Sequence, residues 1–143
     1  MALITYEDKE TLIDNPVAEK YKCTADNLNE IKNAINNITT TTVTPNSSYI
    51  STVQLNHVVK WGQVVMVNFR GLVSANIPNN TTIITLPYQV VNQGTVPAYL
   101  GGAYDYASTL WCSYSGNAFR AGGAFGSASG KYVHIYLVYI TND

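Results

Sequence analysis

Apolar residues recur along the chain at two spacings, and the spacing changes near residue 40. Before that point, they are separated by three, four and three residues, at Leu28, Ile31, Ile35 and Ile38. This spacing places them on one face of a helix. Thr24 can cap the first turn, and Asp26 suits the positive helix end. The sequence therefore predicts a helix over residues 24–38.

The apolar face of this helix is a heptad seam with Ile at both types of core position, a pattern that favours trimers or higher oligomers. The helix is only about two heptads long and rich in Asn, so it would not be stable alone. Two interpretations stay open. Copies of the helix form a trimeric bundle or coiled coil, which we expect, or the helix packs against its own domain.

The segments on either side of the helix have no helical period. Residues 1–23 contain Asn15-Pro16, which breaks a helix. We interpret them as an extended arm that becomes ordered on a partner; the alternative is a frayed terminus. Residues 39–48 (TTTTVTPNSS) are rich in β-branched Thr and contain a Pro. They predict an extended linker.

From Tyr49 onward the pattern is that of β-strands. Val65, Val67 and Phe69 alternate with more polar positions, as in a half-buried strand. Further strands are expected over residues 52–59, 81–86 (stopped by Pro87), 109–114, 118–124 and 131–141. The last is apolar on both faces, which is typical of a sandwich interior or a subunit interface. The prediction is a mainly β protein with a β-sandwich or jelly-roll-like head over residues 49–143.

Composition narrows the possible partners. Charged residues make up 12% of the chain and the net charge is -1. Binding to nucleic acid or docking to a membrane through basic residues would need clustered positive charge. The longest near-apolar run, residues 133–140, is far shorter than the roughly 20 residues of a spanning helix. No secretory signal is visible, so we expect folding in a cytoplasm, where a Cys23–Cys112 disulfide is disfavoured.

Residues for catalysis are sparse. His57 and His134 fall in expected strands, where a histidine usually has a structural partner. Asp105 is the only acid between Glu30 and Asp143, so the head of one chain has no pair of carboxylates for glycoside hydrolysis. No metal-ligand spacing or phosphate-binding loop is present. We expect a non-enzymatic protein without a cofactor or metal.

The best candidate for surface binding is the Gly-rich segment 96–111. It carries Tyr99, Tyr104, Asp105, Tyr106 and Trp111. Aromatic faces stack on the C–H faces of sugars, while the carboxylate accepts hydrogen bonds from hydroxyls. Tyr also anchors protein interfaces at low entropic cost. The alternative is that these aromatic residues are core and trimer contacts. Trp61, beside a turn, is expected to cover the core.

Four segments resemble known virion proteins: KYKCTADNLNEIKNAINN (residues 20–37), WGQVVMVNFRG (61–71), TTIITLP (81–87) and the ending YITND. They are similar to tail-fibre, baseplate and head-fibre proteins of phages and prophages. The resemblance implies a homotrimer with a short helical bundle and a β-sandwich head that attaches to the host surface. It also implies that the arm docks on a head, tail or baseplate protein of the virion. The low charge of the chain fits a host-surface polysaccharide as the ligand.

Other functions stay open from the sequence. The head could be a purely structural decoration of the virion and bind no receptor. The chain could instead be a small carbohydrate-binding module of a bacterial surface protein, with a monomeric head. For a glycan hydrolase, Asp105 would be the one candidate acid in the interior of the head sequence.

Overall fold

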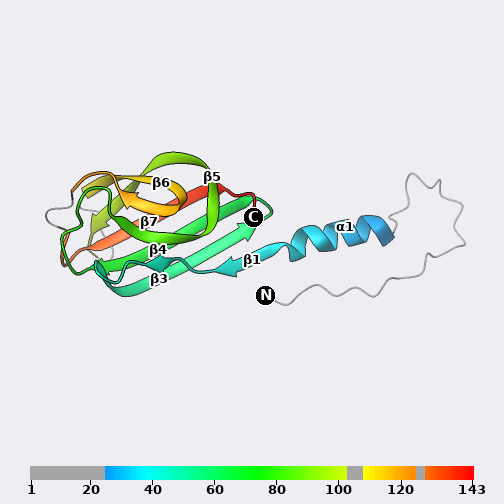
Figure 1. The fold of residues 1–143 in the computed structure, drawn as a ribbon. Helices are drawn as coiled ribbons and strands as arrows, with labels where there is room; N and C mark the ends of the chain where they lie inside the picture. The colour runs from blue at the N-terminus through cyan, green and yellow to red at the C-terminus, as the bar shows by residue number, and fades with distance from the viewer. Residues whose placement is uncertain (1–24, 103–107, 125–127) are drawn as a thin grey trace, which may run out of the picture. The chain divides into compact units, whose positions relative to one another are not determined.

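The computed structural model describes residues 25–102, 108–124 and 128–143 (Figure 1). The chain divides into two compact units, the first ending at Thr39 and the second spanning Thr40–Asp143. Each unit is described by itself. The arm expected over residues 1–23 lies outside the described residues.

The first unit contains one described helix, α1, over Ala25–Asn36. Asp26 lies in its first turn, as expected from the helix dipole. The helix was expected to reach Ile38, and this is wrong. Ile38 instead begins strand β1, where the following β-branched Thr residues favour extended backbone.

The second unit is mainly β, as predicted. The strands are β1 (Ile38–Thr41), which spans the boundary between the two units, and β2 (Thr44–Pro45), β3 (Ile50–Trp61), β4 (Val64–Val73), β5 (Thr82–Gly101), β6 (Ser108–Ala121) and β7 (Tyr132–Ile140) in the second unit. The sheet order is β1-β3-β4-β7-β5-β2, with β6 paired to β5. The pairs β2-β5, β3-β4, β4-β7, β5-β6 and β5-β7 are all antiparallel.

The segment expected to be a linker, residues 39–48, is part of this sheet. β1 pairs with β3 and β2 pairs with β5. Between them, the side chain of Asn56 on β3 holds the backbone of Val43. Asn56 Oδ1 accepts from the Val43 N–H at 2.8 Å, and its Nδ2 donates to the Val43 carbonyl at 2.9 Å. Both backbone groups of Val43 are therefore paired without a strand partner.

β5 is longer than the sequence suggested. The strand beginning near Thr82 was expected to stop at Pro87, but it continues to Gly101. Pro87 is tolerated because the pairing of β5 with β6 is interrupted between Thr85 and Val90, so no ladder hydrogen bond is lost there. With this interruption β5 and β6 curl over the β3-β4-β7 part of the sheet (Figure 1).

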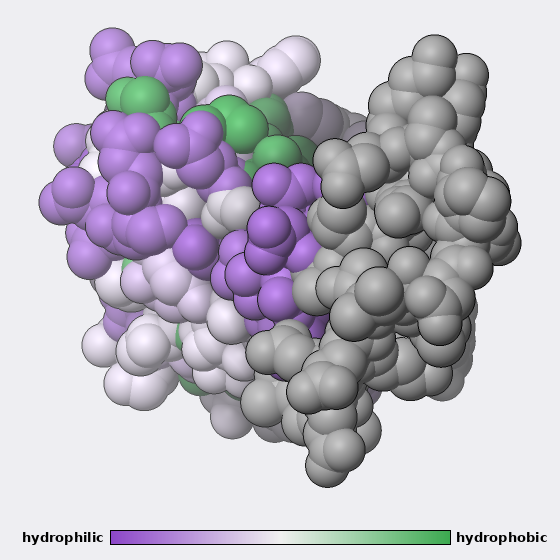
Figure 2. Space-filling view, turned by 90° about the vertical axis from the view of Figure 1, so that its right-hand side faces the viewer, coloured by the Kyte–Doolittle hydropathy of each residue, from purple (hydrophilic) through white to green (hydrophobic). Residues whose placement is uncertain are grey.

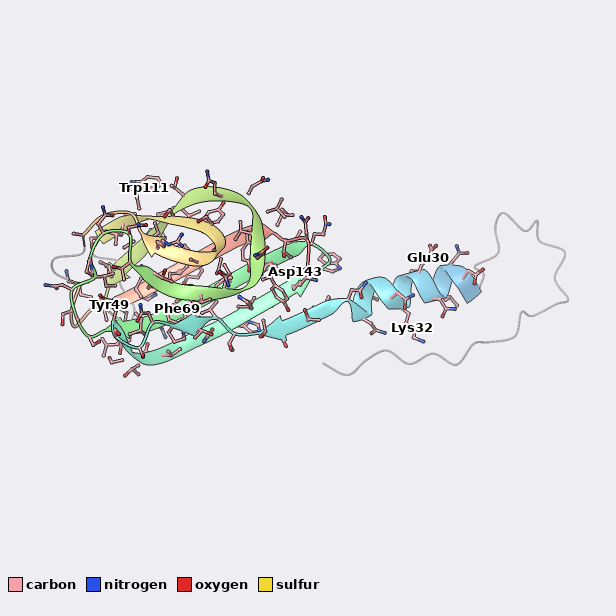
Figure 3. All side chains as sticks on the ribbon, in the orientation of Figure 1. Glu30, Lys32, Tyr49, Phe69, Trp111 and Asp143 are labelled. Atoms are coloured by element: carbon pink, nitrogen blue, oxygen red, sulfur yellow. The ribbon has the colours of Figure 1, made fainter. Side chains whose placement is uncertain are left out.

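The core lies between the curled β5-β6 hairpin and the inner face of β3, β4 and β7. The alternation predicted for β4 is confirmed, since Val65, Val67 and Phe69 are buried. They pair across the strands with inner residues of β7, Tyr139, Leu137 and Ile135. Phe69 is completely buried and lies between the strands in Figure 3. This face therefore anchors the head.

Candidate functional site

The segment expected to bind a surface ligand is a β-hairpin. Tyr99 lies on β5 and Trp111 on β6, while Tyr104, Asp105 and Tyr106 lie outside the described residues. Tyr99 pairs with Thr109, so Tyr99 and Trp111 are diagonal neighbours across the two strands. Such neighbours are about 7–8 Å apart, within reach of aromatic side chains.

Trp111 points out of the hairpin (Figure 3). Its indole is 65% exposed, whereas its neighbour Cys112 is completely buried. Pro97, the cross-strand partner of Trp111, lies on the same outer side because Ala98 points into the core. Together, the outward-facing residues form a surface that we call the hairpin strip: Thr95, Pro97, Tyr99, Thr109, Trp111 and Ser113.

The hairpin strip alternates apolar rings with hydroxyl groups. Thr95 pairs with Ser113 on one side of the Pro97–Trp111 pair, and Thr109 pairs with Tyr99 on the other side. A flat apolar ring flanked by hydroxyls can stack on one face of a sugar and hydrogen-bond to its edge. The strip contains no charged side chain, so it favours a neutral ligand.

The backbone of Trp111 is fixed by a glycine. The Trp111 carbonyl accepts from the Gly122 N–H at 2.9 Å. A Cβ added at Gly122 would lie 2.5 Å from that carbonyl oxygen, closer than real Cβ contacts. Glycine is therefore required for this close approach, which ties the exposed tryptophan to the end of β6.

The other end of the strip is supported by His134. Tyr99 pairs with His134 on β7, and the buried His134 has Nε2 at 3.3 Å from the Gly102 carbonyl oxygen. This hydrogen bond agrees with the prediction of a structural sheet histidine. His57 is different, because it lies on an exposed position of β3.

The residues assigned to oligomerisation are exposed in the single chain. On α1, Leu28, Ile31 and Ile35 expose between 39% and 55% of their surfaces. The fourth member, Ile38, is in β1 and so does not extend the helical seam. The seam is therefore shorter than the sequence suggested.

Trp61 does not cover the core. It ends β3 beside the turn at Gly62, whose φ of 57° is left-handed, and the indole is 60% exposed. The turn itself was predicted. The direction of Trp61 was not, because Lys60, its neighbour, takes the inward side and places Nζ 5.4 Å from the centre of the Tyr88 ring.

Nucleophilic and metal chemistry find little support in the described residues. Burial raises the pKa of the Cys112 thiol from 9.0 to about 12, so the thiolate needed for nucleophilic attack is scarce at neutral pH. No cluster of metal-ligating side chains occurs in residues 25–102, 108–124 and 128–143. Within the same residues, no helix is long and apolar enough to span a membrane.

Sequence reasoning missed two surfaces. The hydroxyl residues of the hairpin strip could have been found from alternation, had β5 and β6 been recognised as continuous strands. The outward apolar residues of β3 and β4 were also missed, although β7 was recognised as apolar on both faces.

The side of the molecule visible in Figure 2 is mostly hydrophilic in its described residues, with few hydrophobic groups.

Comparison with known proteins adds no relative. No family model, no curated protein and no solved structure matches the chain. The resemblance to phage fibre proteins therefore remains a prediction from sequence motifs.

Proposed function

We propose that the chain is a homotrimeric appendage protein of a phage or prophage particle that attaches to a polysaccharide of the host surface. In this proposal, residues 1–23 dock on a head, tail or baseplate protein, and α1 joins three copies. The β unit is a jelly-roll-like head that presents the hairpin strip. It carries out no chemistry and needs no cofactor.

The observation that carries the proposal is an amphipathic helix whose apolar residues are exposed and which belongs to a different compact unit from most of the β sheet. Leu28, Ile31 and Ile35 are largely exposed in the single chain. Packing within that chain therefore does not explain why these positions are apolar. A 12-residue helix is also too short to be stable without packing. Packing against copies of itself satisfies both conditions, and the Ile-rich seam favours three copies.

The hairpin strip supports the attachment role. One tryptophan platform flanked by hydroxyls binds a sugar weakly. Three platforms on one trimer bind a repeating polysaccharide by avidity, which can exceed the affinity of a single site by about 10²–10⁴-fold. The neutral surface suits a cell-wall glycan better than nucleic acid.

The first test is the mass of the full chain in solution by light scattering. A trimer would give about three times the 15.6 kDa of one chain. We expect the double variant Ile31→Asn, Ile35→Asn to weaken this assembly. A monomeric wild-type chain would contradict the trimer and favour a carbohydrate-binding module of a surface protein.

The second test is binding of the labelled full chain to a glycan array and to a panel of bacterial cells. We expect Trp111→Ala to abolish binding and Trp111→Phe to retain part of it, since Phe keeps a smaller stacking surface. Val91→Ala, at an exposed position of β5 outside the hairpin strip, should bind as wild type. A trimer that binds no glycan and no cell would indicate a structural decoration instead.

A further inference from the structure

The outer face of β3, β4 and β7 carries a group of exposed apolar side chains. We call it the outer-face patch, and its members expose between 36% and 62% of their surfaces: Leu55, Trp61, Val64, Met66, Tyr136, Val138 and Ile140. Their sequence neighbours Val65, Val67, Leu137 and Tyr139 are buried on the inner face. The same three strands are therefore apolar on both sides.

The strand register brings the members of the patch together. Trp61 pairs with Val64, and Val64 pairs with Ile140, which makes one row across the three strands. Met66 pairs with Val138 in the next row. The largest apolar patch on a typical monomer covers roughly 300–600 Å² and is often functional. Five of the seven members lie in these two adjacent rows, while Tyr136 lies in the next row and Leu55 in the row after that. Five large exposed apolar side chains in two adjacent rows indicate a surface that packs against another protein surface.

A polar row borders these apolar rows. His57 pairs with Asn68, and Asn68 pairs with Tyr136. Asn68 Oδ1 is buried and has no hydrogen-bond partner. Protein interfaces combine an apolar centre with a few hydrogen-bonding groups, which fix the alignment of the partners. The exposed His57 can supply such a group next to the apolar centre, whereas the buried Asn68 Oδ1 is not accessible to a partner chain.

The charge of this face limits its occupant. The two apolar rows contain no charged side chain, because Lys60 points inward to the Tyr88 ring and Arg70, on the same outer face, lies two rows away beside Leu55. A strongly acidic or basic partner would find little complementary charge in these rows. A second copy of the same uncharged rows meets no repulsion from like charges.

From these observations we infer that the outer-face patch is the surface through which heads of different copies pack against one another. The inference rests on the proposed homotrimer, in which the same patch of every copy faces the shared axis. The helices hold the heads at an effective concentration in the millimolar range, so a modest interface is sufficient. The trimer then has two contact zones, the seam of α1 and the outer-face patch.

The two tryptophans provide a matched pair of reporters. In one chain Trp61 and Trp111 are similarly exposed, at 60% and 65%. Trp61 belongs to the patch, whereas Trp111 lies on β6, separated from β7 by β5. In the full chain, Trp111→Phe leaves Trp61 as the only indole, and Trp61→Phe leaves Trp111.

We expect acrylamide to quench Trp61 several-fold less than Trp111 in a sample whose mass is that of a trimer. Val138→Lys, made in the Trp111→Phe chain, should restore quenching of Trp61 by opening the interface. Val91→Lys is the control, because Val91 is exposed to the same extent as Met66 but lies outside the patch. It should leave Trp61 shielded.

The outcomes separate this inference from the proposed function. A trimer in which Trp61 and Trp111 are quenched equally would overturn the inference and leave the trimer intact. A monomer would overturn both. Shielding of Trp61 that survives in a monomeric Ile31→Asn, Ile35→Asn variant would show that a segment of the same chain covers the patch, and this too would overturn the inference.

Discussion

The inner and outer faces of β3, β4 and β7 carry similar side chains in different surroundings. On β4, the inner Val65 is completely buried, while its neighbour Val64 is among the exposed residues of the outer face. Both are β-branched and both suit a strand. Residue type therefore does not distinguish a core position from an exposed position on the outer face. The distinction comes from what packs above each face, and in this chain the β5-β6 hairpin covers only one of them.

The largest effect is expected on the inner face. Phe69→Ala removes a completely buried ring and leaves a cavity, so the free energy of unfolding should fall by about 3–5 kcal/mol. Urea denaturation followed by circular dichroism measures this change. Because the loss is internal to one chain, it should not depend on protein concentration. A loss below about 1 kcal/mol would mean that the inner face is not the core.

Asn56→Ala should also lower the free energy of unfolding of the single chain, independently of protein concentration. This change leaves the N–H and the carbonyl of Val43 without their partners, at a cost of about 1–3 kcal/mol for each buried group. Asn92→Ala, at an exposed position of β5, is the control and should be near neutral. If the two variants unfold at the same urea concentration, water replaces the Asn56 side chain, and its two hydrogen bonds to Val43 contribute nothing to the free energy of unfolding.

Gly71 tests the tightness of the inner face. A Cβ at this position would lie 2.7 Å from Ile50 Cγ2 and 2.9 Å from Phe69 Cζ. Gly71→Ala should therefore cost about 1–3 kcal/mol through overpacking. Gly123→Ala is the matched control, since no atom lies within 4 Å of its added Cβ. Equal stability of the two variants in thermal denaturation would contradict the close packing.

The buried thiol of Cys112 should make the core sensitive to alkaline pH. Its pKa is about 12 in the folded chain against 9.0 when unperturbed, because burial disfavours the thiolate. A raised folded pKa means that stability is complete below pH 9.0 and is lost as pH rises towards about 12. The loss from this one group should be at most about 1.4 kcal/mol per pH unit.

Urea denaturation at about pH 8 and about pH 10 would measure this slope. Cys23→Ser removes the only other cysteine and serves as the reference chain. Adding Cys112→Val to it should reduce the slope. Burial likewise raises the pKa of Tyr139 to about 12 from 10.0, so a second loss should begin above pH 10. An unchanged slope in the Cys112→Val chain would contradict this account.

The smallest effect on folding is expected on the outer face. Met66→Ala should change the stability of a single chain by no more than about 0.5 kcal/mol, the range usual for exposed positions. At protein concentrations where copies associate, it should cost more, because it removes apolar contact area between heads. A thermal midpoint that shifts with concentration in wild type but less in Met66→Ala would sharpen the contrast with Phe69→Ala. Equal shifts in both chains would remove Met66 from the interface.

Much of the fold follows from local patterns. Alternation along β4 identified its inner residues, and the apolar spacing of Leu28, Ile31 and Ile35 identified α1. The end of the helix was misplaced because Ile38 continues the helical spacing, whereas its pairing through β1 depends on a strand distant in sequence. The full length of β5 was missed because Pro87 usually ends a strand, and only the interruption in the β6 pairing makes it acceptable.

The candidate site was predicted only in part. The aromatic content of the 96–111 segment pointed to Tyr99 and Trp111, and the structure places both on the outer side of one hairpin. The hydroxyl residues around Trp111 were not predicted, because the residues that lie opposite it are set by the cross-strand register, which no local pattern determines. Trp61 was assigned to the wrong environment for the same reason, since a side chain beside a turn can face either way.

The two hydrogen bonds between the Asn56 side chain and the backbone of Val43 have a mechanical consequence. Asn37 is the only residue between α1 and β1, and β1 pairs with β3. Force applied to the chain ahead of β1 would therefore act first on the pairing of β1 with β3 and on the two hydrogen bonds between Asn56 and Val43, before β2 and β5 are strained.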